Sequence, residues 1–100
     1  MFDKQKYLTR GVDADIPLYI QLMMWQAIEQ ARKKTNLDYL QVFRLSQKIH
    51  DGKLIQIIRH TQERPAHGQT ISFYFDAPVT EKIFVIDDGA YATMLLSDEY

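Results

Sequence analysis

Three histidines, His50, His60 and His67, are the residues of this sequence best suited to acid–base or metal chemistry, because the chain contains no cysteine. A neutral imidazole can accept a proton or bind a metal ion near neutral pH. His50 and His67 lie in segments that predict turns, whereas His60 lies late in a predicted strand. No two of them have the His-x-His or His-x-x-x-His spacing of a local metal site. We therefore interpret two as turn residues and one as a sheet residue, and predict no metal ligand.

An acidic run, Asp87-Asp88-Gly89, is the second candidate for chemistry, since clustered carboxylates can bind Ca²⁺. The run lacks the further oxygen ligands that a calcium loop contains. Asp followed by Gly is instead typical of a tight turn, and Asp51-Gly52 repeats the pattern. The serines lack a Gly-x-Ser-x-Gly context, and the glycines form no phosphate-binding loop. The sequence thus contains no catalytic motif and indicates no cofactor, so an enzymatic role stays open but is not favoured.

The sequence predicts one long helix, from residue 13 to about residue 34, and this helix carries many of the apolar side chains. Asp13 or Asp15 can cap its start, and Pro17 suits its first turn. The basic run from Arg32 to Lys34 complements the negative end of the helix dipole.

Two apolar stripes run along this helix at 3.6 residues per turn. The broader stripe must cover a sheet and consists of Ile16, Ile20, Met23, Met24, Ala27, Ile28 and Ala31. The second stripe, Leu18, Leu22 and Trp25, projects from the opposite side. Either this second stripe binds a partner or a second copy of the chain, or another segment of the same domain folds over it. The sequence leaves both interpretations open.

Six segments rich in β-formers predict the strands of a mainly antiparallel sheet. They are residues 7–12, 39–45, 54–61, 70–75, 82–86 and 91–96. Only one helix separates the strands, so the alternating order of a parallel α/β fold is absent. We therefore predict a single α+β domain over residues 1–100. Its five- or six-stranded sheet carries one long amphipathic helix, near the N-terminus, on one face.

The charge and composition argue against binding to nucleic acid and against association with membranes. The 100 residues carry a net charge of −1, which gives little attraction for nucleic acid or anionic lipid. No segment approaches the ~18 consecutive apolar residues of a membrane span. The first six residues lack the apolar region of a signal peptide, and there are no cysteines for disulfides. These features predict a cytoplasmic protein that does not associate with membranes.

Several blocks of the sequence resemble one known family. They are Tyr7-Leu8-Thr9-Arg10-Gly11-Val12, Leu37-Asp38-Tyr39-Leu40-Gln41-Val42-Phe43, Phe84-Val85-Ile86-Asp87-Asp88-Gly89, and Thr93-Met94-Leu95-Leu96 followed by Glu99-Tyr100. They resemble domain-of-unknown-function family 960, whose members are small proteins of staphylococci and related Firmicutes. The resemblance spans most of the chain and implies a small bacterial cytoplasmic protein. It implies no activity, ligand or catalytic residue.

The first hypothesis for function is a non-enzymatic interaction module, either a homodimer or an accessory subunit. It would use Leu18, Leu22 and Trp25 as its contact surface, with the indole of Trp25 as the anchor. The partner is then a protein, and the sequence identifies none.

The alternative hypothesis is a small-molecule-binding or catalytic domain with a sheet-face pocket around Tyr39, His60 and Tyr74. The small-molecule ligand is unknown in that case. Nucleic-acid binding is the least favoured hypothesis because of the net charge. It would depend on Lys4, Lys6, Arg10 and the run from Arg32 to Lys34.

Overall fold

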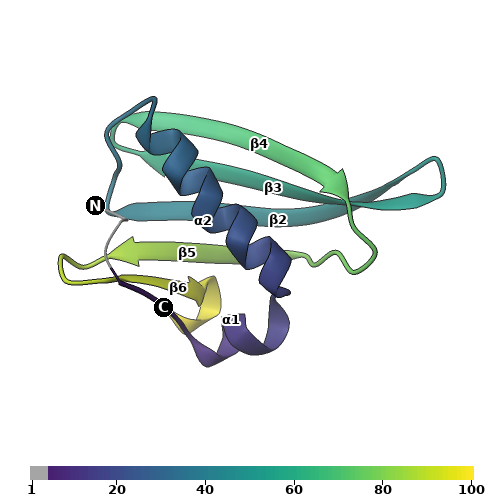
Figure 1. Cartoon of the computed structure of the whole chain (residues 1–100), viewed down its shortest axis with the longest axis horizontal. Helices are drawn as coiled ribbons and strands as arrows, with labels where there is room; N and C mark the ends of the chain where they lie inside the picture. The colour runs from purple at the N-terminus through teal and green to yellow at the C-terminus, as the bar shows by residue number, and fades with distance from the viewer. Residues whose placement is uncertain (1–4) are drawn as a thin grey trace.

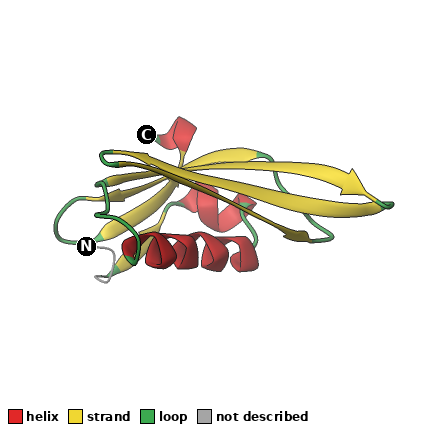
Figure 2. Cartoon of the chain, turned by 90° about the horizontal axis from the view of Figure 1, so that it is seen from above, coloured by secondary structure: helices red, strands yellow, loops and turns green. Residues whose placement is uncertain are grey.

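One six-stranded sheet with a long helix on one of its faces forms the protein in this computed structural model, which describes residues 5–100 (Figures 1 and 2). The first elements are β1 (Lys6–Leu8), α1 (Arg10–Asp15) and α2 (Leu18–Arg32). The strands β2 (Leu40–His50), β3 (Lys53–Glu63), β4 (Ala66–Tyr74), β5 (Glu81–Asp87) and β6 (Ala92–Leu96) follow, and then the short 3₁₀ helix η1 (Ser97–Glu99). The predicted α+β fold is confirmed.

The strands lie in the order β1-β6-β5-β2-β3-β4, and the pairs are antiparallel except for β1 with β6. The β2–β3 hairpin is long, and its tip projects beyond the rest of the sheet (Figure 1). At its turn Asp51 has φ 53° and Gly52 has φ 77°, the left-handed pair that a two-residue hairpin turn needs. The predicted Asp-Gly turn is therefore confirmed.

The core lies between α2 and the face of the sheet that α2 covers. Successive side chains of a strand point to opposite faces, so alternate residues point toward the helix. The sheet contributes Phe43, Leu45, Ile58, Ile83, Val85, Met94 and Leu96. The helix contributes Ile20, Met24, Ala27, Ile28 and Ala31. The broad stripe predicted for the helix is thus buried, with Met23 at its half-buried edge.

The helical region differs from the single helix predicted over residues 13–34, because Pro17 divides it in two. Ile16, the residue before the proline, is extended at φ −110° and ψ 116°, as the proline ring favours. Pro17 then occupies the N-cap of α2, where its missing N–H costs no helical hydrogen bond. Ile16 is still buried, but it reaches the core from the link between the two helices.

The first strand is shorter than the predicted segment 7–12, since α1 begins inside it. Thr9 is the N-cap of α1, and its hydroxyl oxygen accepts a hydrogen bond from the Val12 N–H at 3.4 Å. Gly11 therefore lies in the first turn of a helix and does not end a strand. The other five strands lie at or near their predicted positions, although β2 extends to His50 and β4 includes His67, so neither histidine lies in a turn.

A hydrogen-bonded clasp holds η1 against the start of α1. The Glu99 carboxylate accepts hydrogen bonds from the Thr9 hydroxyl at 2.6 Å, the Gly11 N–H at 3.1 Å and the Leu96 N–H at 2.8 Å. The Thr9 hydroxyl contributes most to lowering the pKa of the Glu99 carboxyl. A Cβ at Gly11 would lie 2.7 Å from Glu99 Oε2, so this approach depends on glycine. Residues far apart in the sequence are joined here.

Candidate interaction surface on α2

The outer side of α2 carries the predicted stripe of Leu18, Leu22 and Trp25. Leu18 is 67% exposed and Leu22 is 55% exposed. Trp25 is half-buried against the core, and the Lys6 ammonium of β1 lies 5.6 Å from the centre of its ring. The first strand therefore reaches Trp25, whereas Leu18 and Leu22 stay open to solvent.

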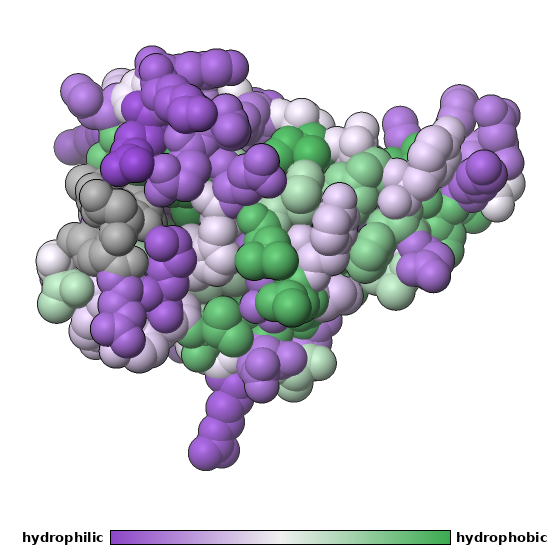
Figure 3. Space-filling view, in the orientation of Figure 1, coloured by the Kyte–Doolittle hydropathy of each residue, from purple (hydrophilic) through white to green (hydrophobic). Residues whose placement is uncertain are grey.

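The apolar surface continues from the stripe toward β4. Tyr19 is half-exposed and packs edge-on against Phe73 and parallel to Phe75, with ring centres 5.4 and 5.8 Å away. In Figure 3, hydrophobic residues gather along the middle of this face and extend toward the projecting hairpin. There the cross-strand pair Ile49 and Leu54 is also exposed. Solvated apolar side chains therefore extend from α2 to the hairpin.

The two ends of α2 carry opposite charges. Asp13 and Asp15 precede the helix and are exposed. Arg32 is the last residue of the helix, Lys33 and Lys34 follow it, and all three are exposed. The apolar stripe thus lies between an acidic end and a basic end.

His60 is buried under α2 and takes part in a closed hydrogen-bond network. Its Nε2 lies 2.6 Å from Gln41 Oε1, and its Nδ1 lies 2.9 Å from the Gln69 amide nitrogen. Since that amide nitrogen can only donate, Nδ1 accepts and Nε2 carries the proton. The imidazole also stacks on Phe43, with ring centres 4.4 Å apart. Burial, and next the neighbouring His67, lowers the pKa of His60 to about 4, so the ring is neutral at pH 7.

The glutamines of this network link the sheet to the surrounding loops and to α2. Gln41 Nε2 donates to Gln62 Oε1 at 2.8 Å, and Gln62 Nε2 donates to the Asn36 and Pro65 carbonyls. Gln69 Nε2 also lies 2.9 Å from the Ala27 carbonyl of α2. The sequence did not predict these buried glutamines, because a glutamine in a strand usually lies on the solvated side.

The predicted pocket around Tyr39, His60 and Tyr74 does not form. His60 is only 1% exposed and its ring nitrogens are occupied, so it lines no cavity. Tyr39 lines a cavity of about 350 Å³ at the start of β2. Tyr74 borders a separate open cleft of about 530 Å³ at the base of the hairpin. The three residues are therefore not brought together.

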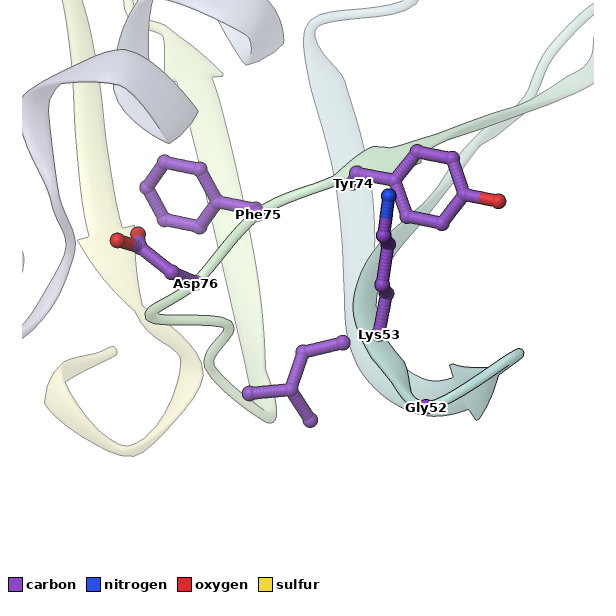
Figure 4. Close-up of a pocket in the computed structure, with 6 residues that line it drawn as sticks. Gly52, Lys53, Tyr74, Phe75 and Asp76 are labelled. Carbon is purple, nitrogen blue, oxygen red and sulfur yellow. The ribbon is translucent and has the colours of Figure 1, made fainter.

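The cleft at the base of the hairpin is mostly apolar. Tyr74 and Phe75 point in different directions from the end of β4 (Figure 4). The Lys53 ammonium lies 5.5 Å from the centre of the Tyr74 ring. The cleft therefore offers mainly apolar contact.

The acidic run begins at the last residue of β5 and continues into a turn, as predicted. Asp87 Oδ1 accepts from the Gly89 N–H at 2.8 Å, and Gly89 has φ 101°. Asp88 Oδ1 accepts from the N–H groups of Ala90 and Tyr91. Across residues 5–100, no three His, Asp or Glu side chains are grouped closely enough to hold a metal ion. No helix within that range is long and apolar enough to span a membrane.

Comparisons with known proteins agree on the relatives of the chain. A family model described as "Staphylococcal protein of unknown function (DUF960)" matches residues 5–99. A crystal structure of a protein of unknown function from Enterococcus faecalis is similar, with a TM-score of 0.79 and 26% sequence identity. The match covers 98% of this chain and 92% of that one. No curated protein matches the chain.

Proposed function

Since the chain belongs to this family of staphylococcal proteins of unknown function, we propose a function from its geometry: a non-enzymatic interaction module of the bacterial cytoplasm that self-associates through α2. The observation that supports this is the exposure of Leu18 and Leu22, 67% and 55%, on a helix whose other side forms the core. Apolar side chains exposed side by side favour association because contact removes them from water.

A second copy of the chain fits this surface because the charges at the ends of α2 are complementary to themselves. In a two-fold dimer whose axis is perpendicular to α2, the same patch on each copy meets its counterpart and the two helices run antiparallel. With the axis midway between Leu22 and Trp25, Leu22 of one copy lies opposite Trp25 of the other. The same arrangement brings the segment before α2, which contains Asp15, toward the last turn of the partner's α2, which contains Arg32. The acidic end of each helix therefore meets the basic end of its partner, and the helix dipoles also oppose.

The test is the solution mass of the protein over a concentration series, measured by light scattering together with the Trp25 emission maximum. We expect a dimer that dissociates on dilution, with Trp25 emission shifting to the red. Leu22→Asp should give a monomer at all concentrations because it buries a carboxylate at the centre of the contact.

The matched control is Tyr39→Asp, since Tyr39 is 57% exposed but lies at the start of β2, away from α2. It should dimerise like the unchanged protein. Arg32→Glu should weaken the dimer, and Asp15→Arg combined with it should restore association. A chain that is monomeric at every concentration, or a Leu22→Asp variant with unchanged mass, would rule out the proposal.

A further inference from the structure

The face of the sheet opposite α2 carries a row of three basic side chains on neighbouring strands. Arg44 of β2 is in register with Lys82 of β5 on one side and with Arg59 of β3 on the other. Their sequence neighbours Leu45, Ile58 and Ile83 point into the core under α2, so all three basic side chains point away from it. Each is exposed.

This row is electrostatically unfavourable in isolation. Neighbouring strands lie about 4.8 Å apart, and like charges directly opposite each other destabilise a sheet. Among residues 5–100, the ion pairs are Glu29 with Arg32 and His50 with Asp51, and none includes a member of the row. The three cations therefore lack a carboxylate partner in the described structure, and an anion from outside the chain would relieve their repulsion.

Arg59 is held in place on this face. Its Nη1 donates to the Thr70 hydroxyl of β4 at 3.0 Å. A Cβ at Gly68 would lie 2.5 Å from Arg59 Nη2, so the guanidinium occupies space that a side chain at this position would fill. The hydroxyl contact leaves the other guanidinium N–H groups available to an anion.

Aromatic rings lie beside the row. Phe84 is two residues from Lys82 on β5, and the Lys82 ammonium lies 5.5 Å from the centre of its ring. Tyr100 packs edge-on against Phe84 with ring centres 5.6 Å apart, and it is 79% exposed. The face therefore combines cations for phosphate groups with exposed ring surface on which a base can stack.

We propose that this open face binds single-stranded nucleic acid. Lys82, Arg44 and Arg59 contact successive phosphates, and bases stack near Phe84 and Tyr100. The row spans two strand spacings, about 10 Å, which is more than a single phosphate group covers. A flat sheet face accepts an extended single strand, whereas base readout in a duplex groove needs a protruding helix or ribbon. The net charge of −1 conceals this surface because it averages over the whole chain.

The basic residues considered from the sequence are not those of this row. Lys6 lies over Trp25, and the run from Arg32 to Lys34 lies at the C-terminal end of α2. Arg10 is the first residue of α1, and Lys4 lies outside the described residues. The row depends on strand register alone, and it lies across the sheet from the proposed dimer contact.

The test is a titration of labelled 12-nucleotide oligouridylate and oligothymidylate with the full chain, followed by fluorescence anisotropy. It is repeated at salt concentrations from about 25 to about 200 mM, since binding to phosphates weakens as salt rises. Three phosphate contacts predict a slope of log K against log salt of about −2, at −0.7 per contact. Arg44→Gln and Lys82→Gln should each reduce the steepness by about 0.7, which is about a fivefold loss of affinity at 0.1 M salt. Arg44→Lys keeps the charge and should keep the slope.

The matched control is Lys33→Gln with Lys34→Gln, which removes charge at the end of α2 and should leave the slope unchanged. Variants are compared only when their circular dichroism matches that of the unchanged chain and thermal unfolding shows that they are fully folded at the temperature of the titration. Absence of binding at 25 mM salt would overturn the proposal. So would an equal loss in the Lys33/Lys34 control, or binding of uridine monophosphate as tight as that of the oligonucleotide. None of these results bears on dimerisation, since the Leu22→Asp variant should bind the oligonucleotides normally.

Discussion

The two faces of the sheet treat their polar side chains in opposite ways. Under α2, His60 and its glutamine neighbours are buried, and their polar atoms are used by other groups of the chain. On the open face, Arg44 and its basic neighbours are exposed without carboxylate partners. Buried polar groups stabilise a fold only when each has a hydrogen-bond partner, whereas cations exposed to solvent need no partner within the chain and can bind a ligand. Polar side chains therefore stabilise the fold under α2, whereas those on the open face are available to a ligand.

The largest expected difference between the two faces is the loss of stability when a side chain is truncated to alanine. His60→Ala removes a ring that stacks on Phe43 and leaves Gln41 Oε1 without its hydrogen-bond donor. We expect it to lower the free energy of unfolding by about 3 kcal/mol. Arg59→Ala, one residue away on the open face, should change it by less than about 0.5 kcal/mol. Urea unfolding of both variants measures the difference, and equal losses would contradict the comparison.

A pH dependence should follow from His60. Its pKa is about 4 in the folded protein and 6.5 ordinarily, so the unfolded chain binds more protons between these values. Stability is then greatest above pH 6.5 and falls as the pH drops toward 4, by up to about 3 kcal/mol. Unfolding in urea across this range measures the loss. His60→Gln should flatten the dependence between pH 6.5 and 5, and an unaltered slope would assign the effect to other groups.

On the open face, removing a charged side chain should increase stability slightly, in contrast to the losses expected under α2. Arg44→Gln removes the central charge of the row, so it should raise the free energy of unfolding by up to about 0.5 kcal/mol. Added salt screens the same repulsion, so the gain should shrink between low and high salt. Thermal unfolding at two salt concentrations tests this. Destabilisation by Arg44→Gln at low salt would show that the row is structural after all.

Local signals in the sequence predicted much of the fold. The strand segments and the Asp51-Gly52 turn depend on neighbouring residues, so the sequence alone was enough to place them. Pro17 was ambiguous, because a proline suits either the first turn of one helix or the N-cap of a second. The exposure of Leu18 and Leu22 could not be predicted, because the helical periodicity of the sequence does not show whether another segment of the chain covers them.

The basic row could not be predicted from the sequence because its members are far apart along the chain. Arg44 and Lys82 become neighbours only through the β2–β5 register, and a shift of one residue would turn either side chain into the core. Burial of Gln41 was equally hidden, since a glutamine in a strand usually indicates the solvated side. Both features therefore emerge from pairing between distant segments.

The parallel pairing of β1 with β6 has a consequence for synthesis of the protein. Lys6 is in register with Ala92, and Thr9 is held by Glu99. These partners are added to the growing chain some 86 to 90 residues later, which takes roughly 4 to 18 s at about 5 to 20 residues per second. During that interval the segment that becomes β1 and α1 has no sheet edge to join. Val12, which the folded protein buries, therefore stays exposed on the nascent chain, where a chaperone can reach it, until β6 emerges.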